Sequence, residues 1–355
     1  MASKYGDFYA APKWGFPKAE ISENVPSPKQ FMPEYQNDPS FYEKGYHLEQ
    51  VGDGDGFYWV TSPAGYDAGF MRTGNGVIAI DAPPQLGENM LAAIKSVTDE
   101  PITHVIYSHW HSDHIGAASM YGSKVKIIAH DITRELLTRF PDPYRPPPTE
   151  TFSKDETLRV NGTTLELSYK GADHCPGNIY IFAPAQKVLT KIDIVSPGSV
   201  TFMHCDASEN ISGFYQAHDD ILTYDFEALI GGHISRWGTR EDVEIAREYW
   251  HDVRSFTDEA LKEMSNYEVL GGFLVGMGRE HALVGAENWI NSMANYITEK
   301  TLTKKTSNGQ TWPERLAGAT PWTKYHAYTV MESSRTERSH QGYQKHGHGG
   351  PTFIV

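Results

Sequence analysis

The chain has 355 residues, of which 39% are hydrophobic and 21% charged, a balance typical of a folded globular protein. Its 45 acidic and 31 basic side chains give a formal net charge of −14, so we expect no nucleic-acid partner. Two cysteines, Cys175 and Cys205, exclude a disulfide framework. The N-terminus is polar and no segment has the length of a membrane span, so we expect a cytoplasmic protein without a membrane partner.

The first part of the chain predicts an arm followed by short strands. Residues 1–45 are rich in Pro, Tyr and Phe without a clear period, and we expect an extended arm over the domain. Alternation between turn signals then predicts an antiparallel meander with strands at 46–51, 57–61, 66–72 and 76–81. The last of these is apolar on both faces, which favours a central position in the sheet.

The middle of the chain predicts alternating helices and strands. Helices are expected at 86–98 and 131–140, and a short helix that begins at about Asp113 and ends at about residue 121, with strands between them at 103–108 and 124–129. This order is typical of βαβ units. The proline-rich segment 141–150 is predicted to be a stiff loop, because proline fixes φ and removes a donor.

A second strand-rich half follows the proline-rich loop. Strands are expected at 157–160, 163–169, 178–183, 188–193 and 226–231, and helices at 209–223 and 240–264. Two halves of this type predict an α/β fold in which two sheets pack between two helical layers, a four-layer αββα sandwich. We expect an arm at 1–45, a catalytic domain at 46–265 and a helix-leaning extension with a tail at 266–355.

Four residues of metal-ligand type occur within a span of six, directly after the buried strand at 103–108. His109 and His111 are two positions apart in an extended loop, so their imidazoles point to the same side. Asp113 and His114 begin the next helix, where a turn aims them at a second point nearby. Buried imidazoles and a carboxylate without a cation would be costly, so the cluster predicts a metal site.

The pattern His109-x-His111-x-Asp113-His114 resembles the signature of the metallo-β-lactamase superfamily. The outlying pieces of that family's pattern occur in the same order, at Asp81, His174, Asp193 and His233. The resemblance spans about residues 46–240 and implies the αββα sandwich of that superfamily. Lys191 and Ile192 precede Asp193, where the family usually has a glycine.

The resemblance implies two Zn²⁺ ions per chain and a role for each matching residue, and ligand type alone leaves iron or manganese open. One zinc would be held by His109, His111 and His174. The second would be held by Asp113, His114 and His233. Asp193 would bridge the ions, and Asp81 would be structural.

The predicted activity is that of a metallo-hydrolase in which a zinc-bound hydroxide opens a small apolar or aromatic lactone or lactam. Asp113 would orient the hydroxide and accept its proton. Phe202, His204 and Trp237 follow the ligand positions in loops and are the predicted substrate-binding residues. The expected partner is a small-molecule substrate, and the oligomeric state, including a homodimer, is left open.

Several other activities use the same ligands. Two classes of the family have different ligands: flavin-linked di-iron relatives usually carry Glu at the position of His111, and antibiotic β-lactamases often carry Cys at that of Asp193. This chain has neither residue, so both classes are disfavoured. Thioester hydrolysis, hydrolytic dehalogenation of an activated aromatic, and mononuclear iron persulfide dioxygenation stay as alternatives. A non-catalytic scaffold is the least favoured, because the ligand set is complete.

Overall fold

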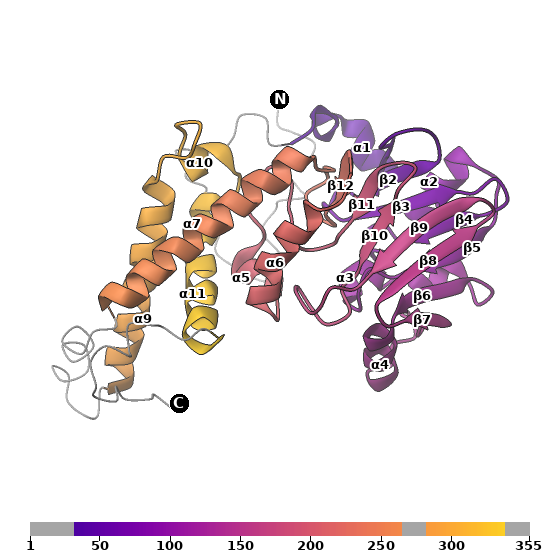
Figure 1. Cartoon of the computed structure of the whole chain (residues 1–355). Coiled ribbons are helices and arrows are strands. Elements are labelled where there is room, and N and C mark those ends of the chain that lie inside the picture. Colours follow the sequence, from indigo (N-terminus) through magenta and orange to yellow (C-terminus); the bar gives the residue numbers. More distant parts are fainter. Residues whose placement is uncertain (1–31, 265–281, 338–355) are drawn as a thin grey trace, which may run out of the picture.

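The computed structural model describes residues 32–264 and 282–337, and its largest element is a seven-stranded sheet (Figure 1). In spatial order its strands are β1 (His47–Gln50), β2 (Phe57–Thr61), β3 (Asp67–Arg72), β4 (Val77–Ile80), β5 (Ile102–Ile106), β6 (Lys126–His130) and β7 (Glu150–Phe152). Strands β1 to β4 are antiparallel neighbours, whereas β4 to β7 pair in parallel. β4 is therefore central, as its two apolar faces predicted.

The second sheet has five strands. In spatial order they are β12 (Ala228–Ile230), β11 (Val188–Thr190), β10 (Tyr180–Ala183), β9 (Thr163–Ser168) and β8 (Asp155–Val160). β11 and β12 pair in parallel, and the other neighbours pair antiparallel. The carboxyl ends of β11 and β12 therefore meet at one edge of this sheet.

Three apolar clusters separate four layers and confirm the predicted αββα sandwich. On β4, Val77 and Ala79 face the cluster that includes Met90 and Ile94 of α2 (Glu88–Val97). Ile78 and Ile80 face the opposite cluster, between the two sheets. The third cluster lies between the second sheet and the helices that pack against it. β4 thus shows the period of two that a strand buried on both faces requires.

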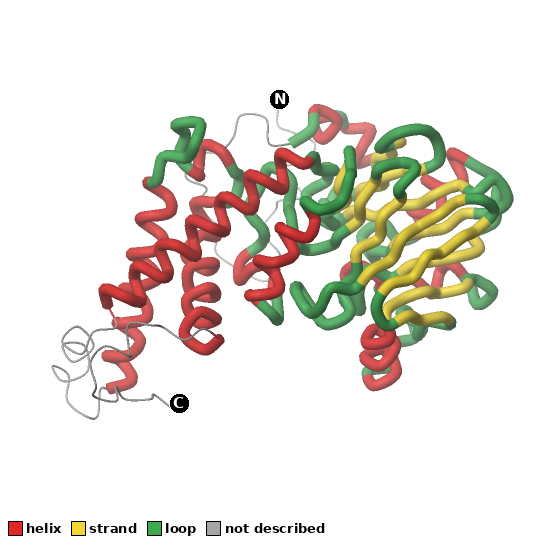
Figure 2. Tube along the Cα trace, viewed as in Figure 1, coloured by secondary structure: helices red, strands yellow, loops and turns green. Residues whose placement is uncertain are grey.

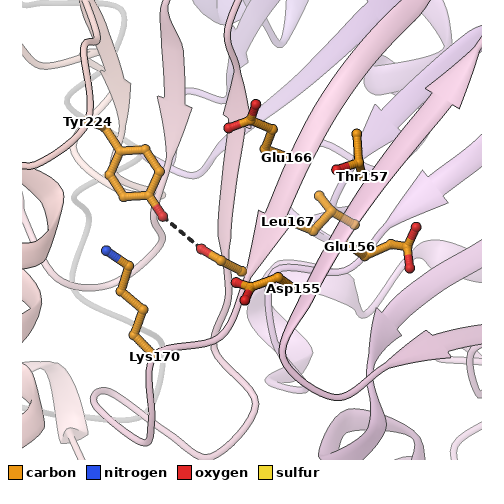
Figure 3. Close-up of a pocket in the computed structure, with 8 residues that line it drawn as sticks. Asp155, Glu156, Thr157, Glu166, Leu167, Lys170 and Tyr224 are labelled. Carbon is orange, nitrogen blue, oxygen red and sulfur yellow. Dashed lines mark hydrogen bonds between the residues drawn. The ribbon is translucent and has the colours of Figure 1, made fainter.

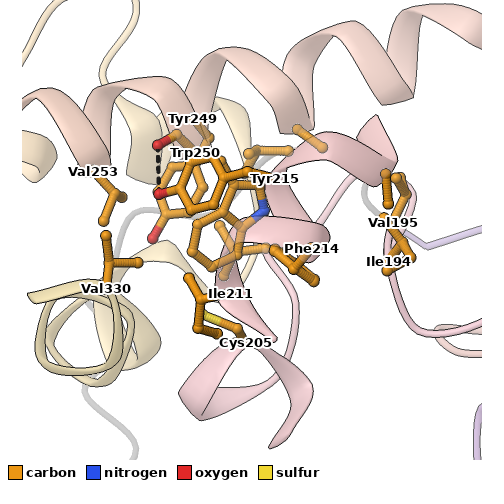
Figure 4. Packing of buried hydrophobic residues seen from close by; sticks show 14 of the residues in the cluster. Ile194, Val195, Cys205, Ile211, Phe214, Tyr215, Tyr249, Trp250, Val253 and Val330 are labelled. Carbon is orange, nitrogen blue, oxygen red and sulfur yellow. Dashed lines mark hydrogen bonds between the residues drawn. The ribbon is translucent and has the colours of Figure 1, made fainter. Parts of the chain in front are cut away.

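The helices that follow β11 in the chain form one apolar cluster that includes the C-terminal extension (Figures 2 and 4). They are α5 (Met203–Ala207), α6 (Ile211–Ile221), α7 (Arg240–Met264), α9 (Ala282–Thr303), α10 (Trp312–Arg315) and α11 (Ala319–Glu337). The extension also bonds to α7, since Trp312 Nε1 donates to Asp252 Oδ2 at 2.9 Å. Residues beyond 281 therefore share their core with the sandwich.

The predicted elements and the structure differ at a few places. Within the expected arm, residues 34–44 form a 3₁₀ turn, η1 (Glu34–Asn37), and α1 (Pro39–Lys44), while the rest of the arm lies outside the described residues. The helix expected up to residue 121 is split into α3 (Ser112–Ile115) and η2 (Ala118–Tyr121). β7 follows α4 (Asp131–Arg139) and the proline-rich loop, and was not predicted.

None of the helices in residues 32–264 and 282–337 is both long enough and apolar enough to cross a bilayer.

A substitution in α9 tests whether the extension shares one core with the sandwich. Ile297 is fully buried, so Ile297→Ala should lower the free energy of unfolding of the whole chain by about 2–5 kcal/mol. Glu299 is exposed on the same helix, and Glu299→Ala should change it by no more than about 0.5 kcal/mol. Chemical denaturation would measure both. A separate transition for the extension, with the sandwich unaffected, would contradict the shared core.

Candidate metal centre

The predicted metal ligands meet where strands of both sheets end. The loop after β5 carries His109 and His111, and α3 carries Asp113 and His114. His174 lies in the loop between β9 and β10. Asp193 follows β11 and His233 follows β12. Because those two strands are parallel neighbours, their following residues reach the same side of the sandwich.

Backbone contacts fix the loops that carry these side chains. Asp81, which follows β4, accepts a hydrogen bond from the Ser108 amide at 2.8 Å and so anchors the start of the histidine loop. Gly232 has φ of +95°, and a Cβ there would lie 3.1 Å from His114 Cε1 and 3.2 Å from Asp193 Oδ1. The cluster therefore needs a glycine directly before His233.

One group of nitrogen donors surrounds the carboxylate of Asp193. His109 Nε2 and His174 Nε2 lie 3.4 and 3.2 Å from Asp193 Oδ2. His111 Nδ1 lies 2.9 Å from His174 Nε2. Donor atoms on one four-coordinate zinc are separated by roughly 3.3 Å, since each bond is about 2.0–2.2 Å long. This group therefore fits a single ion.

A second group shares the same carboxylate. His114 Nε2 lies 3.1 Å from Asp193 Oδ2 and 3.2 Å from His233 Nε2. Asp113 Oδ2 lies 3.4 Å from His114 Nε2 and 3.9 Å from His233 Nε2. The separations again match the edges of a metal coordination shell. Asp193 lies between the two groups, as a bridging ligand would.

Two of the buried atoms that would bind a metal lack a hydrogen bond within the described residues. They are His109 Nε2 and Asp193 Oδ1, whose side chains are at most 3% exposed. Asp193 Oδ1 is 3.1 Å from His233 Nε2, but the angles are not those of a hydrogen bond. Buried polar atoms are rarely left unpaired, so their burial without a hydrogen bond fits a metal ion as the partner.

The charges of the cluster favour a cation. Burial opposes the ionised form of Asp193, but His114, His174 and His233 hold its pKa well below the usual range. Burial would lower the pKa of His114, yet Asp193, Asp113 and Asp81 together raise it to about 10. Burial lowers the pKa of His174 to about 3. In the metal-free protein, a proton on His114 therefore supplies the positive charge that the carboxylates require.

Lys191, two residues before Asp193, forms a buried ion pair with Asp173. Lys191 is fully buried, and its Nζ lies 2.7 Å from Asp173 Oδ2 and 3.0 Å from the Asn178 carbonyl oxygen, to which it donates. The other oxygen of Asp173 accepts a hydrogen bond from the His174 amide at 2.7 Å. This pair links the loop of His174 to the strand end that carries Asp193.

The three predicted substrate-binding residues make contacts on two sides of the cluster. Phe202 is 52% exposed and packs on Trp322 of α11. His204 contacts α11 through a 3.0 Å hydrogen bond with Thr329. Trp237 Nε1 donates to Glu49 Oε2 of β1 at 2.9 Å, and its ring packs against the cluster between the sheets. The structure thus places Phe202 and His204 together and Trp237 apart from them.

Both cysteines are buried and neither forms a disulfide. The Cys175 thiol lies near His109, His111 and His174, within the same 4.8 Å group of donors, and burial raises its pKa well above the usual range. Cys205 instead points into the apolar cluster of the helices (Figure 4). Of the two thiols, only Cys175 is within reach of the candidate metal centre.

A surface depression of about 310 Å³ lies on β8 and β9, lined partly by Glu156, Glu166, Lys170 and Tyr224 (Figure 3). The Tyr224 hydroxyl and Ser168 share a hydrogen bond of 2.7 Å at its rim. It contains none of the metal-ligand residues, so it is separate from the candidate metal centre.

A model of the metallo-β-lactamase superfamily matches residues 61–233, the segment that carries every donor of the two groups. The chain belongs to the metallo-β-lactamase superfamily. The match begins at the end of β2 and ends at His233, so it covers the second sheet and strands β3 to β7 of the first.

The individual relatives share little sequence identity with this chain. The chain is 27% identical over 192 residues to the 2,4-dinitroanisole O-demethylase subunit alpha of Nocardioides sp. (strain JS1661). That alignment covers 53% of this chain and 58% of the relative, which is less than two thirds of either. Solved metallo-β-lactamases, one from Pontibacter korlensis and the enzyme IND-7, have TM-scores of 0.48 and 0.49 at 21% and 20% identity. They cover 57% and 56% of this chain, and 97% and 95% of their own chains are matched.

Replacement of His111 tests the donor geometry. His111→Ala removes one of three imidazoles from the first group, so the purified protein should hold at least one metal ion fewer per chain than wild type. The exposed His251 on α7 provides the control, and His251→Ala should keep the wild-type metal content. Elemental analysis of both proteins after identical metal loading makes the comparison. Equal metal content in all three proteins would refute the assignment.

Metal binding should release protons, because a histidine must be neutral to bind a metal. The pKa of about 10 for His114 means that this imidazole is protonated in the metal-free protein at pH 7.5. The pKa of His233 is raised too, since Asp193 outweighs the effect of burial. Metal affinity should therefore increase with pH towards 10. Calorimetric titration at pH 7.5 in buffers of different ionisation enthalpy should show release of about one proton or more per chain. Heat independent of the buffer would contradict this.

Proposed function

We propose that this chain is a metal-dependent hydrolase that binds two divalent ions, zinc in the first instance, and opens a small apolar or aromatic lactone or lactam. The observation that carries the proposal is the convergence of the two donor groups on Asp193, together with the buried atoms His109 Nε2 and Asp193 Oδ1, which have no hydrogen bond within the described residues. A bound pair of such ions lowers the pKa of coordinated water and supplies a nucleophile near neutral pH.

The protein's own residues have distinct roles in this proposal. Asp113 is the most exposed of the carboxylates in the two donor groups, with 39% of its side chain accessible, so it faces the space from which substrate arrives. We assign it to orient the attacking water and to accept its proton. Asp193 is 3% exposed and is assigned to hold the two ions together.

Aromatic rings on both sides of the cluster support an apolar or aromatic substrate. The ring of Tyr66 lies 4.7 Å from that of His233. The ring of Trp110 lies 5.3 Å from that of His111 and 6.3 Å from that of Phe140, which is 51% exposed. We propose that these rings, with Phe202 and His204, contact the substrate. Trp237 has the weaker case because its indole is bonded to Glu49.

A second candidate activity is favoured by the relative from Nocardioides, whose name states that it demethylates 2,4-dinitroanisole. The same activated water would add to the ring carbon that bears the methoxy group of a nitro-activated aryl ether. The carbon–oxygen bond to that group would then break, giving a phenolate and methanol without any oxidant. Hydrolytic dehalogenation would follow the same course with halide as the leaving group.

A substrate panel separates these activities. Metal-loaded protein would be assayed with lactones, lactams, thioesters, 2,4-dinitroanisole and nitro-activated aryl halides. Ring opening with no release of phenolate would support the lactone or lactam assignment, and phenolate formation would support the aryl ether alternative. No metal-dependent turnover of any class would contradict the hydrolase proposal.

Asp113→Asn tests the proposed proton acceptor. An amide does not accept the proton, so turnover of the substrate found in the panel should decrease by about 10²-fold or more. Asp225→Asn, at a position with 85% of its side chain exposed, removes the same charge elsewhere and should keep wild-type turnover. The metal content of both variants would be measured beside their kinetics. Unchanged turnover in Asp113→Asn would refute the role.

A further inference from the structure

We propose that Asp206 is an additional ligand of the second metal position, and that α11 holds it there. The inference rests on the two-metal site proposed above. It assigns to that site a residue outside the matched family pattern, from the turn that connects the sandwich to the helical cluster. The second position would then have two imidazoles and three carboxylates, whereas the first has three imidazoles and one carboxylate.

The position of the Asp206 carboxylate carries the proposal. Its Oδ2 lies 4.0 Å from His233 Nε2. Oxygen or nitrogen atoms of Asp206, Asp193 and His233 all lie within 4.8 Å of one another. Ligands on opposite sides of one ion are separated by about 4 Å, twice the bond length, so this spacing fits a five-coordinate ion. His233 is the one ionic partner of Asp206 among the described residues.

An unpaired oxygen in the same group points to a cation. Asp193 is 3% exposed, and its Oδ1 has no hydrogen bond within the described part of the chain. Asp206 therefore adds a second carboxylate, 18% exposed, beside a buried one that is already incompletely paired. Like charges at such short range are costly without a positive ion between them.

The backbone at Asp206 adopts an uncommon conformation that directs the side chain to the cluster. Residues 204–207 all have positive φ, between 55° and 59°. Each non-glycine residue in this region costs about 1–2 kcal/mol, with aspartate and asparagine better tolerated than most. Within this turn Cys205 points into the apolar cluster of the helices (Figure 4). The carboxylate of the next residue, Asp206, instead approaches His233.

Contacts on both sides hold the turn in this conformation. His326 of α11 bonds to the carbonyl oxygens of Thr201 and Phe202, at 3.1 and 3.3 Å. After the turn, the Glu209 amide donates to the His174 carbonyl at 2.8 Å. The helical extension and the loop of His174 thus fix the two ends of the segment that carries Asp206, which gives the extension a role in metal binding.

The test compares metal affinity in Asp206→Asn and wild type. Asparagine tolerates positive φ, so the turn should be kept while the carboxylate is lost. Competition with a chelator during Zn²⁺ titration should show one ion bound as in wild type and one bound about 10-fold or more weakly. Asp206→Gly is a second variant in which strain cannot disturb the turn, because glycine adopts this φ freely, and it should show the same loss.

Glu209→Gln is the matched control, because it removes one charge from an exposed position three residues away. It should bind both ions as wild type does. An equal loss in this control would mean that the effect is one of general charge, and would overturn the ligand assignment. Two ions bound normally in both Asp206 variants would overturn it as well, and would leave the two-metal proposal intact. A wild-type protein that binds a single ion would refute both.

Discussion

The arrangement of this protein depends on one buried carboxylate, that of Asp193. It lies at the carboxyl end of β11, and imidazoles from four different segments lie within 3.1–3.4 Å of its oxygens. A carboxylate this deeply buried is costly unless positive charge surrounds it. Three features bring the imidazoles close to this carboxylate: the two sheets, the loop of His109 and His111, and the glycine before His233.

The position of Asp193 also explains how the layers of the fold cooperate. β11 and β12 are parallel, so Asp193 and His233 emerge side by side. The first sheet reaches the same edge, and its Tyr66 forms a bridge with His233. Behind the cluster, the buried pair of Lys191 and Asp173 connects the loop of His174 to the same strand end. Contacts of both sheets and of their loops therefore position the candidate ligands.

Local patterns in the sequence predicted most of the sandwich and the grouping of His109 to His114, because strand period and short spacings are properties of adjacent residues. The distant members of the cluster, His174, Asp193 and His233, were predicted from the family resemblance alone. β7 was missed because its three residues follow a proline-rich run that obscures any alternation. Asp206 was missed because its approach to His233 depends on a left-handed turn and on α11, more than 100 residues later. The direction of the Trp237 indole likewise depends on a distant partner, Glu49. Contacts of this kind leave no periodic signal in the sequence.

The most direct test of the account is a crystal structure of the metal-loaded protein with anomalous diffraction at the zinc edge. We expect two zinc peaks, one on each side of Asp193. One should lie among His109, His111 and His174, and the other among Asp113, His114 and His233. A single peak, or peaks away from these side chains, would contradict the assignment of the cluster as a two-metal centre.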